Sequence, residues 1–175
     1  MKGDKVHHAF RVVYNGIARQ LLTECAIALP SATNPLPKKD FHKFKAIWDT
    51  GATNSVITEN VVKKISLAPT GKINSYGVHG QSEVNTYILD IGLPNHVCIQ
   101  NVRVSEAKLM GDIDVLIGMD IIQAGDFAIC NPDMKTIFSY CMPSHKNPID
   151  LLEKSDKVNK SNHCVPTPII ATSTK

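Results

Sequence analysis

The stretch that decides the fold is AIWDTGATNSVI, residues 46–57. Its first three residues, Ala46 to Trp48, are apolar, and the triplet Asp-Thr-Gly follows them at residues 49–51. An apolar run of this kind is typical of a strand that is buried on both faces. Asp49 therefore comes at the end of a buried strand, where a lone carboxylate is costly to keep.

A carboxylate in this position becomes useful when a second carboxylate lies beside it. The two then share one proton, because like charges at contact distance cannot both ionise. The charged member acts as a general base toward water, and the protonated member acts as a general acid toward a peptide carbonyl. In this scheme Thr50 supplies a hydroxyl that can bond to a partner loop. Gly51 lets two backbones approach closely and leaves an amide free to point at the carboxylate.

Short strands and turn residues alternate along most of the chain. The sequence predicts strands at residues 10–14, 21–29, 41–48, 55–57, 86–91, 97–104, 115–118, 127–130 and 136–140. Thr58 can cap a short helix that runs through Ile65, and a second brief helix opens at Met119 or Asp120. A polar, glycine-containing segment at residues 73–87 predicts a hairpin with an exposed tip. This succession favours an all-β barrel or sandwich.

Length and composition indicate one globular domain with a tail. The chain has 175 residues, 43% of them hydrophobic, and a formal net charge of +3, which is too weak to indicate nucleic acid as a partner. We expect an N-terminal extension, possibly a strand, at residues 1–20, the main domain at 21–143 and a flexible tail at 144–175. Five irregularly spaced cysteines, no visible signal peptide and no apolar stretch of membrane-spanning length favour a cytoplasmic protein without a membrane partner.

An isolated Asp-Thr-Gly is also a reasonable turn, so its context has to decide. The triplet lies between two apolar strands, VLIGMDII follows at residues 115–122, and YGVHGQSEVNTY lies between them at residues 76–87. In this order the three segments resemble the retroviral-type aspartic proteases (retropepsins), and the bacterial and cellular relatives in particular. The resemblance covers about residues 21–140.

The resemblance implies a closed all-β acid-protease barrel with one or two short helices, active as a homodimer on protein or peptide substrates. Each chain would contribute one Asp49, supported by Thr50 and Gly51 in the catalytic loop. Substrate would contact Ala52 and a flap, and Ile117 and Gly118 would pack beneath the loop. The expected flap residues are Tyr76, Gly77, Val78, His79 and Gly80. No cofactor is expected, and the relatives imply a bacterial cytoplasm.

The chain departs from the viral pattern at three places. Thr53 stands where viral members usually carry Asp, a change that is common in cellular relatives. Met119 follows Gly118 where viral members often have Arg, so a dimer-supporting ion pair is missing. The tail after Pro143 has no obvious counterpart. These differences bear on the dimer interface more than on the catalytic loop.

Other interpretations remain open at this point. The same barrel can be a non-catalytic binding or dimerisation module that keeps the triplet for structure, or a monomer that is latent until an end is trimmed. His79 is either a substrate contact or an exposed hairpin residue. The pairs His96/Cys98 and His163/Cys164 lack the four convergent ligands of a zinc site, so no metal is expected. No G-x-S-x-G elbow supports a serine hydrolase.

Overall fold

The computed structural model of the chain describes residues 6–30, 40–77 and 80–161. The chain divides into two compact units, Met1–Ser144 and His145–Lys175. The domain limits expected from the sequence, 21–143 for the barrel and 144–175 for a flexible tail, stay predictions. None of the described helices combines the length and the apolar character that crossing a membrane would require.

The first unit is built almost entirely from strands. In chain order they are β1 (His8–Val13), β2 (Leu21–Ala28), β3 (His42–Trp48), β4 (Val56–Ile57), β5 (Gly71–Gly77), β6 (Gly80–Gly92), β7 (Cys98–Glu106), β8 (Val115–Ile117), β9 (Asp126–Cys130) and β10 (Ile137–Met142). The short helices are α1 (Glu59–Lys64), α2 (Met119–Ile122) and the 3-10 turn η1 (Pro132–Met134). Every strand expected from the sequence is present, with ends displaced by a few residues.

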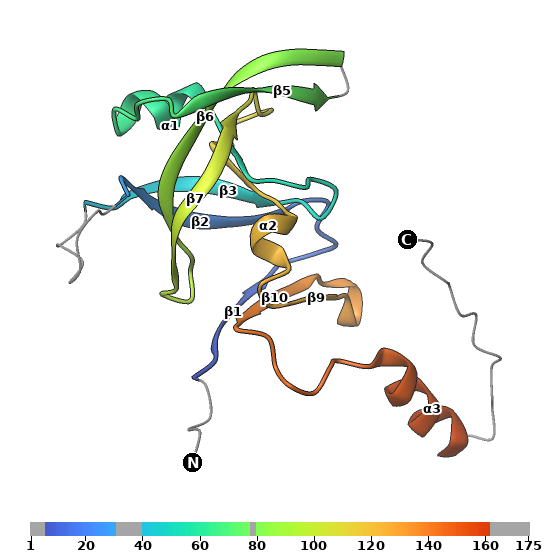
Figure 1. Cartoon of the computed structure of the whole chain (residues 1–175). Helices are drawn as coiled ribbons and strands as arrows, with labels where there is room; N and C mark the ends of the chain where they lie inside the picture. The colour runs from blue at the N-terminus through green and yellow to red at the C-terminus, as the bar shows by residue number, and fades with distance from the viewer. Residues whose placement is uncertain (1–5, 31–39, 78–79, 162–175) are drawn as a thin grey trace. The chain divides into compact units, whose positions relative to one another are not determined.

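The larger sheet closes into a barrel. Its strand order is β2-β3-β8-β4-β7-β6-β5, and β2 also pairs with β6. The strands β2, β3, β8, β4, β7 and β6 therefore form a closed ring, and β5 lies outside it (Figure 1). Apolar side chains fill the interior, among them Ile27, Leu89 and Ile117, each fully buried. The prediction of a closed all-β barrel with short helices is confirmed.

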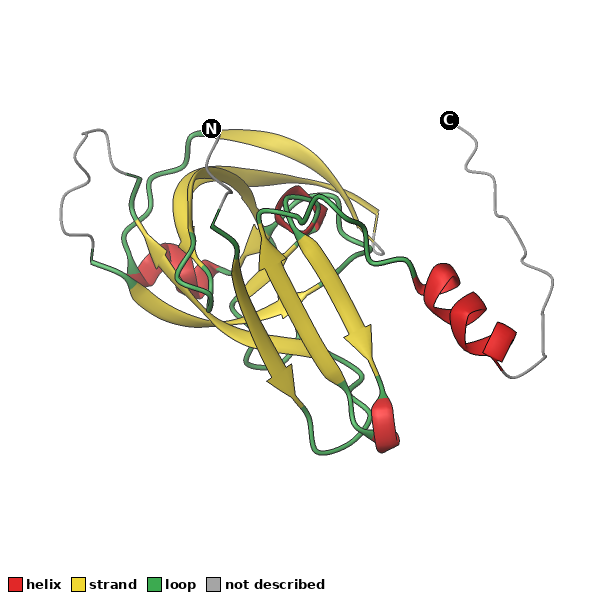
Figure 2. Ribbon diagram, turned by 90° about the horizontal axis from the view of Figure 1, so that it is seen from below, coloured by secondary structure: helices red, strands yellow, loops and turns green. Residues whose placement is uncertain are grey.

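A second sheet of three antiparallel strands has the order β1-β10-β9. Figure 2 shows these strands side by side, with η1 at the end of the β9–β10 hairpin. The register places Phe10, Tyr140 and Phe127 in one row across the sheet. All three rings pack around Trp48 at the end of β3, with centroid distances of 4.9–6.2 Å. The N-terminal strand β1 thereby covers the end of β3, immediately before Asp49.

The described part of the second unit, residues 145–161, contains the helix α3 (Leu151–Ser161). Asp150 begins it, because its Oδ1 accepts hydrogen bonds from the amides of Leu152 at 2.8 Å and Glu153 at 3.0 Å. Glu153 and Lys157 add an ion pair one turn apart. The sequence analysis assigned no helix here, since the polar composition gave little apolar periodicity.

Candidate active site

The Asp-Thr-Gly loop starts where two parallel strands end together. β3 and β8 pair in parallel, with Trp48 opposite Ile117. The ladder continues one step further, because the Asp49 amide donates to the Ile117 carbonyl oxygen at 3.0 Å. The backbone of Asp49 is therefore fixed by β8, while its side chain leaves the sheet at the strand end.

Within the loop, the backbone turns back onto the Asp49 side chain. The Gly51 amide donates to Asp49 Oδ1 at 2.8 Å, and the Ala52 amide donates to the Asp49 carbonyl oxygen at 3.3 Å. A Cβ on Gly51 would lie 3.1 Å from the same Oδ1. Asp49 and Ala52 are half-buried, whereas Thr50 and Gly51 are exposed in the single chain. Asp49 is thus partly accessible at the loop, and Thr50 and Gly51 beside it are open to solvent.

Gly118 lies directly against the returning part of this loop. A Cβ at Gly118 would stand 2.7 Å from the Asn54 carbonyl carbon and 3.0 Å from the Ala52 carbonyl oxygen. The absence of a side chain lets α2 approach the loop, so the Met119 amide bonds to Ala52 O at 2.8 Å. The Asp120 amide bonds to Thr53 O at 3.1 Å. Close approach, not an unusual φ, is the reason for glycine here.

A contact that the sequence analysis did not foresee joins Ser55 to Asp120. Asp120 Oδ1 accepts from Ser55 Oγ at 2.8 Å and Oδ2 accepts from the Ser55 amide at 3.0 Å. Ser55 Oγ in turn accepts the Gly118 amide at 3.0 Å, and Ser55 is fully buried. The sequence places Asp120 only at the opening of a brief helix, because spacing along the chain does not show which segments lie face to face.

The expected flap is the hairpin of β5 and β6. The register pairs Tyr76 with Gln81 and Gly77 with Gly80, so the backbones of three expected flap residues lie at the hairpin end. Val78 and His79 lie outside the described residues. Lys72 and Glu83 form an ion pair of 2.7 Å further down the hairpin. The hydrogen bonds of the Asp49 loop given above go to β8 and α2, whereas β5 pairs only with β6 in the described sheet.

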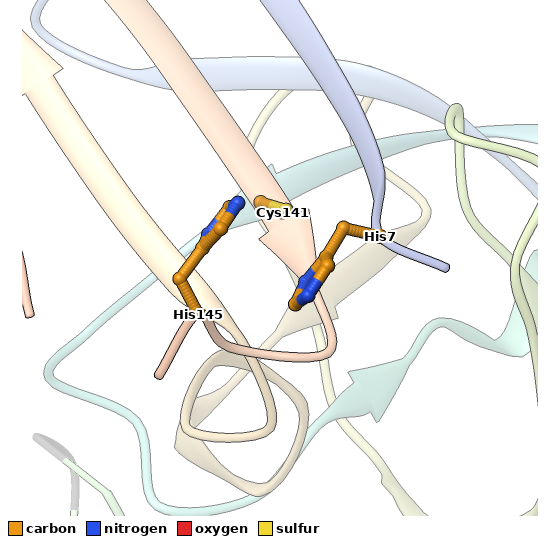
Figure 3. A group of neighbouring side chains, drawn as sticks. All are labelled: His7, Cys141 and His145. Carbon is orange, nitrogen blue, oxygen red and sulfur yellow. The ribbon is translucent and has the colours of Figure 1, made fainter. Parts of the chain in front are cut away.

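Of the residues weighed as metal ligands, only His96 and Cys98 belong to the described part of the chain. His96 and Cys98 are both exposed, and no group of three ligating side chains among the described residues includes them. His163 and Cys164 lie outside the described residues. Figure 3 shows His7 and Cys141, which both bond the Pro143 carbonyl oxygen, at 2.9 Å from His7 Nδ1 and 3.9 Å from Cys141 Sγ. Burial, with a smaller effect of Asp126, raises the pKa of the Cys141 thiol, which suits its role as a donor.

Comparison with known proteins bears on this architecture. The aspartyl protease family model matches residues 39–121, just under half of the chain, including the Asp-Thr-Gly loop and Gly118. No curated protein sequence matches the chain.

Several solved structures are similar over much of their own length. A retropepsin-like aspartic protease from Rickettsia conorii has 14% identity, covers 78% of this chain and 96% of its own, and has a TM-score of 0.47. EIAV protease complexed with the inhibitor HBY-793 has 23% identity, coverages of 64% and 92%, and a TM-score of 0.44. The retroviral protease-like domain of Ddi1 from Leishmania major has 17% identity, coverages of 70% and 95%, and a TM-score of 0.44. The family match over residues 39–121 confirms the resemblance to aspartic proteases that the sequence indicated for this part of the chain.

Proposed function

We propose that the protein is an aspartic endopeptidase that works as a homodimer, with one Asp49 from each chain. The observation that carries this proposal is the geometry of the loop: Asp49 directly follows β3, whose last residue Trp48 is buried, and its Oδ1 accepts the Gly51 amide at 2.8 Å. Its backbone is fixed by β8 through a bond of 3.0 Å to Ile117. A carboxylate held this rigidly and left half-exposed suits a reaction with an external molecule.

A single chain supplies only half of the catalytic pair. Among the described residues, the Asp49 side chain accepts one hydrogen bond, from Gly51. The acid nearest in the loop network, Asp120, has both carboxylate oxygens occupied by Ser55. The second carboxylate is therefore expected from a second copy, whose exposed Thr50 and Gly51 would meet those of the first. Two like loops related by a twofold axis bring identical carboxylates together.

In the assembled pair, two carboxyl groups share one proton. The charged Asp49 removes a proton from a water molecule, and that water attacks the peptide carbonyl carbon. The protonated Asp49 of the second copy donates to the carbonyl oxygen, and collapse of the tetrahedral intermediate transfers a proton to the leaving amine. Because one carboxyl must be charged and the other protonated, kcat/KM is expected to follow a bell-shaped pH profile.

The direct test is cleavage of a broad peptide library across pH by the wild type and by Asp49→Asn. The amide cannot act as a base, so cleavage should fall at least about 100-fold while the circular dichroism spectrum and the sedimentation coefficient stay unchanged. Asp112→Asn is the matched control, because Asp112 is an exposed acid that pairs with Lys45 away from the loop. Cleavage that survives in Asp49→Asn would refute the mechanism.

The alternative is a barrel that binds or dimerises without catalysis. The exposed Thr50 and Gly51 would serve such a module as a contact surface equally well. A dimer in sedimentation that cleaves nothing in the library at any pH would support this alternative. Inhibition by a hydroxyl-bearing transition-state analogue would support the endopeptidase.

We further infer that the protein works in a reducing compartment such as the cytoplasm. The four cysteines among the described residues, Cys25, Cys98, Cys130 and Cys141, carry free thiols. Two of them, Cys98 and Cys130, are exposed, and exposed thiols persist where the surroundings are reducing. Fractionation of cells that express a tagged chain would test this inference.

A further inference from the structure

We propose that Asp120 is a positioning residue for the Asp-Thr-Gly loop, acting through the buried Ser55. This inference rests on the proposed peptidase function and adds a residue to that same site. The Asp120 carboxylate bonds to Ser55 and Ile121, and none of these hydrogen bonds involves Asp49. It belongs to α2, whereas the residues that it holds belong to the loop between β3 and β4.

Both oxygens of the Asp120 carboxylate, and the amide and hydroxyl of Ser55, take part in hydrogen bonds. Asp120 Oδ2 accepts the Ser55 amide at 3.0 Å, and Oδ1 accepts both Ser55 Oγ at 2.8 Å and the Ile121 amide at 3.1 Å. The Ser55 hydroxyl donates its hydrogen bond to Asp120, and its Oγ uses a lone pair to accept the Gly118 amide at 3.0 Å. One carboxylate therefore satisfies the backbone and the hydroxyl of a residue that no water reaches.

The contact also completes the attachment of the whole loop. At its start, the Asp49 amide is held by Ile117, and in its middle Ala52 and Thr53 accept the first two amides of α2. Ser55 is the last anchor before β4. Without the carboxylate, a buried amide and a buried hydroxyl would lose their partner, and the loop would shift to reach other ones. A displaced loop moves Asp49, and small misplacements of a reacting group cost large factors in rate.

The geometry separates positioning from direct catalysis. Both oxygens of Asp120 are engaged, so neither is free to activate water. An Asn at this position can accept the Ser55 amide through its Oδ1 and donate to Ser55 Oγ through its Nδ2, although the hydroxyl hydrogen then loses the acceptor that Asp120 gives it. Asp120→Asn therefore keeps the two segments joined by two hydrogen bonds and removes the charge, whereas Asp120→Ala removes both. A catalytic acid or base would not tolerate either change.

The experiment compares Asp120→Ala, Asp120→Asn and Ser55→Ala with the wild type, and Asp112→Ala serves as a control that removes the same charge at an exposed site. Peptide cleavage gives kcat and KM for each variant. Amide NMR of the same samples follows the Gly51 resonance, which reports the bond to Asp49 Oδ1, and the hydrogen exchange of the Ser55 and Gly118 amides. The NMR measurements need no peptidase activity.

We expect Asp120→Ala and Ser55→Ala each to lower kcat by about 10- to 100-fold with little change in KM, and their double variant to be no worse than either. Asp120→Asn should stay within about threefold of the wild type, and Asp112→Ala should be unchanged. The Gly51 resonance should move in Asp120→Ala and stay in Asp120→Asn.

Different outcomes overturn different statements. An unmoved Gly51 resonance and unaltered exchange in both Asp120→Ala and Ser55→Ala would refute the positioning role, whether or not the protein is a peptidase. Loss of cleavage in Asp120→Asn equal to that in Asp120→Ala, with the Gly51 resonance unmoved in Asp120→Asn, would also refute it, because the charge itself would then matter. If no variant and no wild type cleaves peptides, but the NMR shifts follow the expected order, the proposed function fails and the positioning contact stands. If Asp120→Ala does not fold, Ser55→Ala and Asp120→Asn still decide.

Discussion

At the scale of single residues, the candidate site depends on a glycine that allows close packing and on a carboxylate that accepts a hydrogen bond from its own loop. Asp49 is half-buried, and its side chain accepts a hydrogen bond from the Gly51 amide. Gly118 has no side chain, which lets α2 approach the loop. The chemistry therefore relies on close backbone contacts, which a single added methyl group can disturb.

The first prediction concerns Gly118→Ala. Its Cβ would stand 2.7 Å from a backbone carbon of Asn54, and backbone cannot turn aside as a flexible side chain can. We expect a loss of about 1–3 kcal/mol in the free energy of unfolding, measured by urea denaturation, together with a loss of cleavage. Gly16→Ala is the control, because nothing lies within 4 Å of its added Cβ. Equal stability of the two variants would contradict the packing account.

The second prediction concerns Cys25. Burial, with smaller effects of Asp114 and Glu24, raises the pKa of its thiol from 9.0 to about 12. The folded protein therefore holds this proton more tightly than the unfolded chain does. The stability that this difference contributes is present below pH 9 and is lost as the pH rises from 9 toward 12. Urea denaturation at several alkaline pH values should show this decline, reduced in Cys25→Ala relative to its own value at pH 7.

The reactivity of the thiols provides a separate check. Iodoacetamide at pH 8 should modify the exposed Cys98 and Cys130 rapidly and Cys25 only on unfolding, as read by mass spectrometry. Rapid labelling of Cys25 in the native protein would contradict its burial.

At the scale of elements, the strands form the core, and the residues of the candidate site lie where two of the strands end. β3 and β8 end side by side, so the Asp49 amide reaches the Ile117 carbonyl oxygen although the two residues lie far apart in the sequence. β1 crosses to β10 and covers Trp48 with Phe10. An element at the N-terminus thus supports the strand from which the catalytic loop leaves.

The prediction at this scale is a cost in stability for Phe10→Ala. The ring of Phe10 packs 5.5 Å from Phe138 and 5.7 Å from Trp48, so its removal leaves a gap between two sheets of strands. We expect a loss of about 2–4 kcal/mol, followed by the fluorescence of Trp48, which is the single tryptophan of the chain. Phe41→Ala is the control, since Phe41 is 39% exposed. A loss no larger than that of the control would show that β1 is dispensable.

The sequence predicted the elements well and their contacts less well. Strands such as β3 could be predicted from the sequence, because turn residues stand at the ends of their apolar runs. The Asp-Thr-Gly and Gly118 segments could be predicted as a site because they match a family pattern. The hydrogen bonds between Ser55 and Asp120 could not be predicted from the sequence. A serine beside a short strand and an aspartate in a short helix each have ordinary local explanations. Helix α3 was missed because its capping residue, Asp150, starts a segment with little apolar character.

At the scale of the whole molecule, the proposal requires two chains. Exposed Thr50 and Gly51 and a single Asp49 per chain predict activity that depends on protein concentration. On dilution below the dissociation constant of the dimer, specific activity should fall, and sedimentation velocity at the same concentrations should show a parallel loss of dimer. Constant specific activity across a range in which the dimer dissociates would indicate a monomeric enzyme.

The central claim is that one catalytic site contains Asp49 from two chains. Wild type and Asp49→Asn, mixed in equal amounts and allowed to exchange subunits, should retain about one quarter of the activity of the same total amount of wild type, because only pairs of wild-type chains are active. The same mixture with Asp112→Asn should retain full activity. A mixture with Asp49→Asn that retains about one half of the activity would show that each chain works alone, and would contradict the account.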